Sequence, residues 1–425
     1  MADQAGRFPD LLPATPETRG LDERDAALAH AIYDAVIRRW ITLEYLLNTT
    51  LKQPLDSAEP SLQAVLLAGA AQLLLLDRIP VHAALNESVE LAKRLVRPGA
   101  APLTNAVLRK IAGLRAVSPQ PGVTDTLPLA DGRSLPLTRD VFPANPVERL
   151  AAVTSHPRHL ITAWIERFGL DAATALAHHS LVTPPTILNT AFARDPGALT
   201  AIPHTEPGHH VSTASRYELL TLLSSRNDLW VQDPASSRAV ASVAHLRPNL
   251  IADVCAGRGT KTRQLAATFP SARIIASDAD PERVRALRAT FSGHPRIQIA
   301  PLAALPQLAA GKADLVLLDV PCSNTGVLAR RPEARYRAGA EQLARLAGIQ
   351  RQIIAEAAPL LSDSPRGRIL YSTCSIEPDE NERQVEWAVR WRQFHVEHAA
   401  TLLPHGAPGD EPTRYHDGSF SALLG

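Results

Sequence analysis

Apolar residues recur at helical spacing through the first part of the chain. A stretch of period 3.6 begins near Leu21, breaks at Arg78-Ile79-Pro80 and then resumes. This pattern predicts helices at about 21–41, 62–76, 81–95 and 103–114. We therefore expect a small all-helical domain over residues 1–116.

Proline and glycine dominate the next thirty residues. Six prolines and two glycines between positions 117 and 146 predict a Pro-rich linker with room for a small hairpin. Helical signals return at about 156–179, and a short mixed stretch follows to about Trp230. We interpret residues 147–235 as a small mixed α/β segment.

The period of the pattern changes after Val240. Short apolar runs typical of buried strands occur at 250–254, 273–277, 313–319 and 368–371. Helical patterns at 262–268, 282–290 and 342–360 separate them. This alternation predicts βαβ units and a Rossmann-like, doubly wound parallel sheet over residues 236–425. The fold class is thus multidomain, α followed by α/β.

Composition narrows the class of protein. The chain has 425 residues with 45% hydrophobic content, enough for separate cores, and it has no apolar stretch of membrane-spanning length. Its three cysteines form no C-x-x-C pair, and no apolar signal peptide precedes them. These features disfavour metal and disulfide readings and favour a reducing compartment. We expect a cytoplasmic monomer with neither a membrane segment nor a metal site.

Positive charge is concentrated in one stretch, although the formal net charge is only +1. Between Leu91 and Gln120 there are six cationic residues and no acidic one. They are Lys93, Arg94, Arg97, Arg109, Lys110 and Arg115. Such a run is either a solvated face or a surface that binds the phosphates of a nucleic acid.

Two cysteines follow predicted strands. Cys322 stands in Leu317–Ser323 and Cys374 in Tyr371–Ser375. Open α/β sheets hold their ligands at the carboxyl ends of strands, so both thiols are candidate nucleophiles. Buried packing is the alternative for either thiol taken alone, because cysteine is among the most buried residue types.

A glycine-rich turn follows the first predicted strand of the sheet. It spans Asp253–Thr262, and Asp278 ends the next strand about 20 residues beyond its glycines. Small residues let backbone amides approach a charged group, and an acid at that separation is placed to bind ribose hydroxyls. The pair favours an adenosine-containing cofactor, either S-adenosylmethionine or a dinucleotide. Asp280, before Pro281, is interpreted as a helix cap.

Three motifs resemble the Nop/Sun family of RNA cytosine-5 methyltransferases. They are Leu317–Val327, Arg331-Pro332-Glu333 and Tyr371–Glu382. In addition, Gln72–Glu87 and Thr104–Arg109 are similar to the NusB-like RNA-binding domain of the bacterial small-subunit rRNA member. The similarity covers nearly the whole chain and is weakest at about 117–230.

The resemblance implies roles for individual residues. Cys374 matches the nucleophile that adds to C6 of cytosine, Cys322 the thiol that assists release, and Asp319 the acid beside the base. The implied cofactor is S-adenosylmethionine. Its implied contacts are Cys255, Ala256, Gly257, Arg258, Gly259, Thr260, Lys261, Asp278 and Asp319. The helical domain is expected to bind RNA through Arg78, Arg94, Arg97, Arg109 and Lys110.

The chain departs from the family pattern at two places. Arg258 and Thr260 replace a proline and a glycine of the turn, and Ala300–Leu305 lacks the acid that the family tends to carry near the adenine. We expect an RNA cytosine-5 methyltransferase acting on a single-stranded or looped site, with small-subunit rRNA as the favoured target. The alternatives are a non-catalytic RNA-binding factor of ribosome assembly and a methyltransferase of tRNA or another RNA.

Overall fold

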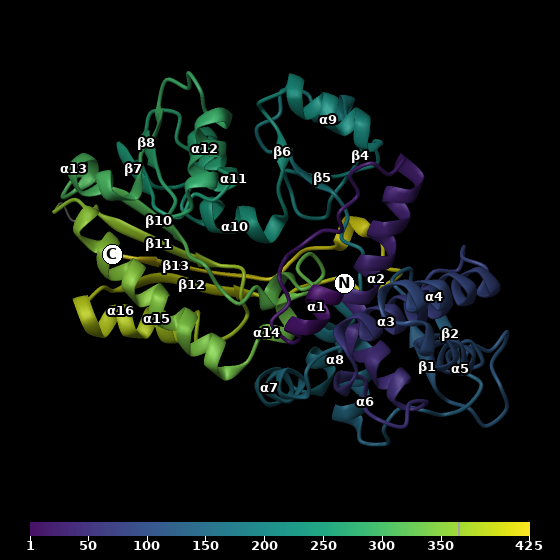
Figure 1. The fold of residues 1–425 in the computed structure, drawn as a ribbon. Helices are drawn as coiled ribbons and strands as arrows, with labels where there is room; N and C mark the ends of the chain where they lie inside the picture. Colours follow the sequence, from purple (N-terminus) through teal and green to yellow (C-terminus); the bar gives the residue numbers. More distant parts are fainter. Residues whose placement is uncertain (364–365) are drawn as a thin grey trace. The chain divides into compact units, whose positions relative to one another are not determined.

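The computed structural model describes residues 1–363 and 366–425, and the chain forms two compact units (Figure 1). The first unit consists of Met1–Thr183, Leu328–Gly339 and Ala407–Asp410. The second consists of Pro184–Val327, Ala340–Gly406 and Glu411–Gly425. Among the described residues, no helix has the length and apolar character needed to span a membrane.

The first unit is mostly helical. Its helices are α1 (Ala2–Arg7), α2 (Glu23–Asn48), α3 (Pro60–Leu75), α4 (Val81–Leu95), α5 (Ala101–Ala112), α6 (Pro146–Thr154), α7 (Arg158–Phe168), α8 (Leu170–His179) and α14 (Ala334–Arg337), with 3₁₀ turns at Leu55–Ser57 and Pro98–Ala100. Leu43, Leu66 and Leu108 are among the leucines that form its core. The four helices expected in this region are present, each with ends shifted by at most a few residues except for the longer α2.

The stretch expected to be a linker is built into this core. Strands β1 (Thr126–Pro128) and β2 (Ser134–Pro136) form an antiparallel hairpin. Leu127 and Leu135 lie opposite one another in it, and both are buried with the helices. The prolines stand at the ends of these two short strands, where a missing N–H costs little. The boundary between the two units therefore differs from the expected one. Residues 117–183 belong to the first unit, and the second unit begins at Pro184.

A short segment from far along the chain completes the first unit. Helix α2 is kinked at Arg39, whose φ of −125° and ψ of 22° are not helical. At this break the Tyr336 hydroxyl accepts from the Trp40 N–H at 3.2 Å and donates to the Ile37 carbonyl at 2.6 Å. The kink thus has an identifiable cause: a side chain inserted into the hydrogen-bond ladder of the helix.

The neighbouring Arg335 is fully buried and forms no ion pair with a carboxylate of the described residues. Its guanidinium donates to the carbonyls of Thr154 and Ser180 at 3.2 and 3.1 Å. Burial lowers the pKa of Arg335 to about 10, so the side chain remains charged at neutral pH. Carbonyl dipoles therefore carry the compensation that a salt bridge would normally supply.

The second unit contains two sheets. The large sheet has the order β12-β13-β11-β10-β7-β8-β9 and the small one β4-β5-β3-β6. The strands are β3 (Ile187–Asn189), β4 (Ala201–Pro203), β5 (His209–Ser212), β6 (Trp230–Val231), β7 (Leu250–Asp253), β8 (Arg273–Ala276), β9 (Ile297–Ile299), β10 (Leu315–Asp319), β11 (Arg368–Thr373), β12 (Val396–Leu402) and β13 (Ser419–Leu424). The helices are α9 (Arg216–Ser225), α10 (Pro234–Ser242), α11 (Thr260–Thr268), α12 (Pro281–Thr290), α13 (Leu305–Ala309), α15 (Ala340–Ala357) and α16 (Glu382–Arg392), with 3₁₀ turns at Pro196–Ala198, Leu302–Ala304, Thr325–Val327, Ala358–Leu360 and Pro412–Arg414.

Helices cover both faces of the large sheet. In β10, Leu315 and Leu317 face α10, α11 and α12, whereas Val316 and Leu318 face α13, α15 and α16. Figure 1 shows α15 and α16 on the side of the sheet opposite to α11 and α12. A strand buried on both faces reads as a continuous apolar run, which is why β10 was recognisable in the sequence.

The expected α/β architecture is confirmed, with one addition. Strands β11, β10, β7, β8 and β9 are parallel, as expected. β13 lies antiparallel to β11, and β12 pairs with β13, so the sheet is mixed. Asp280 caps α12 as interpreted, accepting from the Glu282 N–H at 2.9 Å.

Candidate active site

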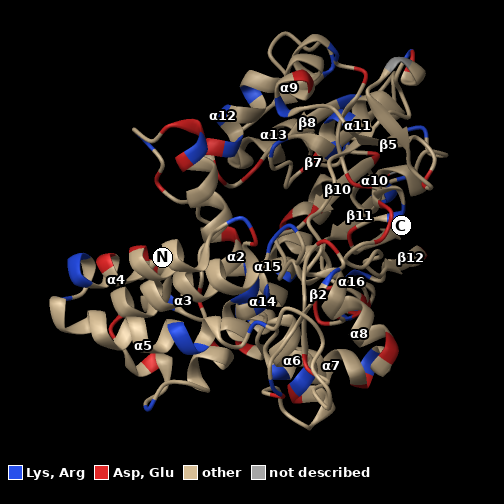
Figure 2. Ribbon diagram, turned by 90° about the vertical axis from the view of Figure 1, so that its right-hand side faces the viewer, with Lys and Arg blue, Asp and Glu red and all other residues tan. Residues whose placement is uncertain are grey.

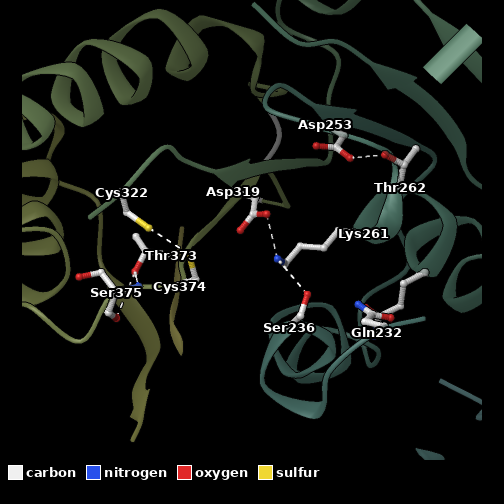
Figure 3. A network of polar contacts seen from close by, with 12 residues as sticks. Gln232, Ser236, Asp253, Lys261, Thr262, Asp319, Cys322, Thr373, Cys374 and Ser375 are labelled. Atoms are coloured by element: carbon white, nitrogen blue, oxygen red, sulfur yellow. Dashed lines mark hydrogen bonds and ion pairs between the residues drawn. The ribbon is translucent and has the colours of Figure 1, made fainter. Parts of the chain in front are cut away.

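The two cysteines lie just beyond the carboxyl ends of two neighbouring parallel strands of the large sheet. β10 ends at Asp319 and β11 at Thr373, and their register pairs Asp319 with Ser372. The loops that follow therefore leave the sheet side by side. Cys322 Sγ and Cys374 Sγ lie 3.2 Å apart, and Figure 3 shows the two thiols pointing toward one another. The structure thus brings together the two cysteines that the sequence placed at strand ends.

A buried glutamate positions the loop that carries Cys322. Glu380 accepts from the Ser323 N–H at 2.8 Å and from Gln350 Nε2 at 3.2 Å, and the Ser323 hydroxyl also donates to it. Burial raises the pKa of Glu380, although its hydrogen bonds with Ser323 oppose that shift. Sequence reasoning missed this role, even though Glu380 lies in the motif that follows Cys374. One signal for this role was available in the sequence. Glu380 belongs to the motif that contains Cys374, but the proposed chemistry gives it no task, which suggests a structural role.

Two asparagines hold the loop that carries Cys374. Asn381 accepts from the Thr373 hydroxyl at 2.6 Å and donates to the Ser375 carbonyl at 2.9 Å, so it grips both sides of the cysteine. Asn324 Oδ1 accepts from the Cys374 thiol at 3.2 Å. Neither asparagine was singled out from the sequence, because amide side chains at strand ends are common in loops.

The close approach of the two cysteine loops requires a glycine. The Gly326 N–H donates to the Cys374 carbonyl at 2.9 Å, and the Gly326 carbonyl accepts from the Gly418 N–H at 2.7 Å. A Cβ at position 326 would lie 2.7 Å from the Cys374 oxygen and 2.8 Å from that of Gly418. Any side chain there would push the loops apart, and with them the two thiols.

The two thiols are not equivalent. A hydrogen bond with Cys374, together with burial, raises the pKa of Cys322 well above the usual thiol value. Cys322 is therefore a thiol at neutral pH and can donate to the sulfur of Cys374.

Asp319 is paired with a lysine from the glycine-rich turn. Lys261 Nζ lies 2.9 Å from Asp319 Oδ2 and 3.4 Å from Ser236 Oγ, as Figure 3 shows. Burial alone would lower the pKa of Lys261, but the charge of Asp319 and its hydrogen bond outweigh that effect and raise it. The lysine is thus a fixed positive charge beside Asp319.

The glycine-rich turn is tied to the next strand. The Gly257 N–H donates to Asp278 Oδ2 at 2.9 Å, and Asp278 Oδ1 accepts from the Asp280 N–H at the same distance. Gly259 has φ of 87°, and a Cβ there would lie 2.5 Å from the ring of Phe291. The packing of Phe291 therefore explains Gly259, for which the sequence had suggested approach to a cofactor.

Asp253 was not among the predicted site residues. It ends β7, is fully buried and accepts from the Thr262 hydroxyl at 2.7 Å. Its other carboxylate oxygen makes no hydrogen bond to any described residue. Burial raises the pKa of Asp253 to about 7. A polar residue that closes an otherwise apolar strand was the signal for it.

A cavity of about 570 Å³ lies beside the turn. It is lined by Val254, Cys255, Ala279, Leu302, Ala303, Leu305, Pro306, Ile353, Glu356, Ala357 and Leu360. Ala279 directly follows Asp278, so a nucleoside whose ribose bonds to Asp278 would have its base at this largely apolar space. Each Asp278 oxygen has a second lone pair for a ribose hydroxyl. The residues therefore fit an adenosine-containing cofactor. Of the two residues that depart from the family pattern in the turn, Arg258 is exposed and Thr260 is the first residue of α11.

The predicted RNA-binding residues all belong to the first unit and are all exposed. Figure 2 shows cationic segments on α4 and α5. Acids outside the basic run pair with three of its six cations: Glu90 with Lys93, Glu59 with Arg97 and Asp77 with Arg115. Arg94, Arg109 and Lys110 have no ion pair with a described residue, and Arg109 donates to Asn105 Oδ1 at 3.0 Å. Only part of the run is thus free to face phosphates.

Family models match both parts of the chain. The model described as 16S rRNA methyltransferase RsmB/F matches residues 243–408, and that of the NusB family matches residues 5–113. The second match confirms the NusB-like character expected for the helical domain.

Curated relatives and solved structures extend over most of the chain. Ribosomal RNA small subunit methyltransferase B of Sodalis glossinidius is 30% identical over 96% of this chain and 90% of its own length. The Bacillus subtilis protein named probable ribosomal RNA small subunit methyltransferase B is 26% identical over 88% of this chain and 82% of its own length. The crystal structure of PH0851 shares the fold, with a TM-score of 0.68 at 20% identity over 96% of this chain and 91% of that one.

Proposed function

This chain belongs to the RsmB/F family of 16S rRNA methyltransferases, and we propose that it transfers a methyl group to C5 of a cytosine in small-subunit ribosomal RNA. The observation that carries the proposal is the pair of thiols 3.2 Å apart at the ends of β10 and β11. Methyl transfer to a heteroatom needs no such pair. Carbon 5 of cytosine does, because a nucleophile must first add to C6 and must later be expelled.

S-adenosylmethionine, when bound, supplies the electrophilic methyl group. Asp278 and the Gly257 turn would hold its ribose, and the cavity beside Cys255 and Ala279 would take its base. Lys261 pairs with Asp319 at the end of β10, the strand that precedes Cys322. The proposal thus places the methyl donor and the thiols along one edge of the sheet.

The covalent step begins at Cys374. Its thiolate adds to C6, the sulfur–carbon bond forms, and the electron pair of the C5–C6 double bond becomes available at C5 for the methyl group. Asp319 is proposed to face N3. A proton taken up there from solvent, and shared between N3 and the carboxylate, would neutralise the charge that moves into the ring, and Lys261 compensates the carboxylate.

Release follows from the unequal thiols. Once the Cys374 sulfur is bonded to C6, its hydrogen bond no longer raises the pKa of Cys322, whereas burial and the charge of Glu380 still do. We propose that Cys322, after losing its proton to solvent, takes the proton from C5. The C5–C6 double bond re-forms, the sulfur–carbon bond breaks and Cys374 leaves as a thiolate.

The two thiols give separable predictions. Cys374→Ala should abolish both methylation and the covalent RNA adduct, because nothing then adds to C6. Cys322→Ala should still add to the base but fail to release it, so protein crosslinked to RNA accumulates. Denaturing gels with labelled substrate RNA measure the adduct, and exposed Ser224→Ala serves as a control that turns over normally. A methylating Cys374→Ala variant would contradict the mechanism.

Bisulfite sequencing of total RNA identifies the target. A deletion strain should lose methylation at a cytosine of small-subunit rRNA, and the wild-type gene but not Cys374→Ala should restore it. Loss at a tRNA instead would favour the alternative substrate. No lost methylcytosine, together with no binding of S-adenosylmethionine at millimolar concentration, would favour a non-catalytic assembly factor.

A further inference from the structure

The cavity beside the glycine-rich turn contains one charged group. Ten of its eleven lining residues are alanine, valine, leucine, isoleucine, proline or Cys255, and the eleventh is Glu356 of α15. Burial raises the pKa of Cys255, so its sulfur is an uncharged thiol and a weak acceptor. Among the side chains that line this space, the Glu356 carboxylate is the strong hydrogen-bond acceptor.

The segment after β9 offers this cavity no side-chain acceptor. After β9 the chain contributes Leu302, Ala303, Leu305 and Pro306, all apolar. An aminopurine bound here would bury its exocyclic amine, and an unpaired buried donor costs affinity. The cavity therefore accommodates the ring of the base but, without Glu356, leaves its amine to backbone or solvent.

Glu356 is held in place by its own helix. Gln352 lies one turn earlier in α15, and its Nε2 donates to Glu356 Oε1 at 2.8 Å. This bond restrains the carboxylate and leaves Oε2 available to a ligand. An exposed glutamate is otherwise too mobile to define specificity, because ordering its rotamers costs free energy.

We infer that Glu356 is a specificity-determining residue that accepts a hydrogen bond from the 6-amino group of the adenine. This inference rests on the proposed function, since it concerns the methyl donor of that reaction. It assigns to α15 the contact that the apolar Ala300–Leu305 segment lacks. A base with a 6-oxo group should be rejected, because two acceptors would face one another.

Binding of two ligands tests the inference without relying on turnover. Calorimetry compares S-adenosylhomocysteine with S-inosylhomocysteine, in which an oxygen replaces the amine. The wild-type protein should prefer the adenosyl ligand about tenfold or more, as expected for one charge-assisted hydrogen bond. Glu356→Gln should weaken the adenosyl ligand and strengthen the inosyl ligand, because an amide can donate to the 6-oxo group.

Two further variants separate specificity from structure. Glu356→Ala should weaken the adenosyl ligand without gaining the inosyl ligand. Glu341→Gln, at the other end of α15 and outside the cavity, should leave both affinities unchanged. Glu356 is exposed, so all three variants should fold, and thermal unfolding checks this.

The outcomes distinguish this inference from the proposed function. An adenosyl preference that is the same in Glu356→Gln as in the wild type, with clear binding in both, overturns the role of Glu356 and leaves the methyltransferase proposal standing. A wild-type protein that binds neither ligand overturns both. A loss of preference confined to the Glu356 variants supports the inference.

Discussion

Beneath the glycine-rich turn, Asp253 couples the stability of the site to pH. Its pKa is about 7 in the fold, against 3.8 for the free side chain, because burial disfavours the charged form. The folded state therefore holds this proton more tightly than the unfolded chain does. The stability that results is fully present below about pH 4 and is lost as the pH rises through 7.

Asp253→Asn should remove this dependence. The amide oxygen can still accept from Thr262, but no proton has to be released as the pH rises. We expect the wild type to lose free energy of unfolding between pH 5 and 8 relative to the variant. At roughly 1.4 kcal/mol per unit of pKa shift, the difference is on the order of a few kcal/mol. Urea denaturation at both pH values measures it.

The control for this experiment is Asp171→Asn, which changes an exposed carboxylate on α8 and should follow the wild type. Parallel pH profiles of the wild type and Asp253→Asn would show that the buried carboxyl does not titrate in this range.

At the same scale, the sequence located the candidate site residues more readily than the side chains that support them. Asp319 ends β10, and Cys322, Cys374 and Asp278 follow shortly after β10, β11 and β8. Strand ends are visible in the hydrophobic pattern. Glu380 acts through bonds to a loop distant in sequence, and no periodicity reports such a contact. The role of a residue such as Glu380, which depends on a contact with a distant part of the chain, could therefore be identified only from the structure.

Among the elements, the inserted segment of α14 is the one with the clearest energetic role. Tyr336 fills the break in α2, and Ser155 Oγ lies 3.1 Å from its hydroxyl and accepts from the Ile41 N–H at 3.0 Å. Phe8 stacks against Trp40 beside them. The hydroxyl of one tyrosine therefore satisfies backbone groups that the kinked helix cannot pair internally.

Tyr336→Phe should destabilise the first unit by about 1–3 kcal/mol, because the Ile37 carbonyl and the Trp40 N–H would be left buried without a partner. Differential scanning calorimetry measures the loss. Tyr217→Phe, which changes a tyrosine that is 80% exposed, is the matched control and should have no effect. Equal melting temperatures for the two variants would contradict the role given to Tyr336.

The elements that the sequence revealed are those with one strong local pattern. β7, β8, β10 and β11 are continuous apolar runs, and each was expected within a few residues. β12 was not, because its first four residues are exposed and, among the described strands, β13 is its one neighbour at the edge of the sheet. In residues 117–146 the abundance of proline concealed the buried leucines of the hairpin. Local composition did not predict these elements, because contacts with residues far away in the sequence determine their structure.

Across the whole molecule, local pairing changes the significance of the basic run. Six cations with no acid in the same stretch suggested a uniformly positive surface. The fold brings Glu59, Asp77 and Glu90 to three of them. Counterion release depends on cations that are free to meet phosphates, so the residues to test are Arg94, Arg109 and Lys110.

Replacing these three residues together by glutamine should weaken RNA binding and reduce the slope of log K against log salt by about 2–3, at roughly 0.7–0.9 per phosphate contact. The matched control replaces Lys93, Arg97 and Arg115, which removes the same charge from paired positions and should change the slope less. Filter binding from low to moderate salt measures both. Identical slopes for the two triple variants would show that this face does not bind phosphates.

The insertion of Leu328–Gly339 into the first unit also affects how the protein is made. The ribosome releases the helices up to Thr183 long before it releases Arg335 and Tyr336. At 5–20 residues per second, roughly 8–30 s separate the two events. During that interval the nascent helical unit lacks the Tyr336 hydroxyl that bonds to both sides of the α2 kink, so the unit stays incompletely folded. Synthesis speed over the intervening residues, and the chaperones available then, should therefore influence the yield of folded protein.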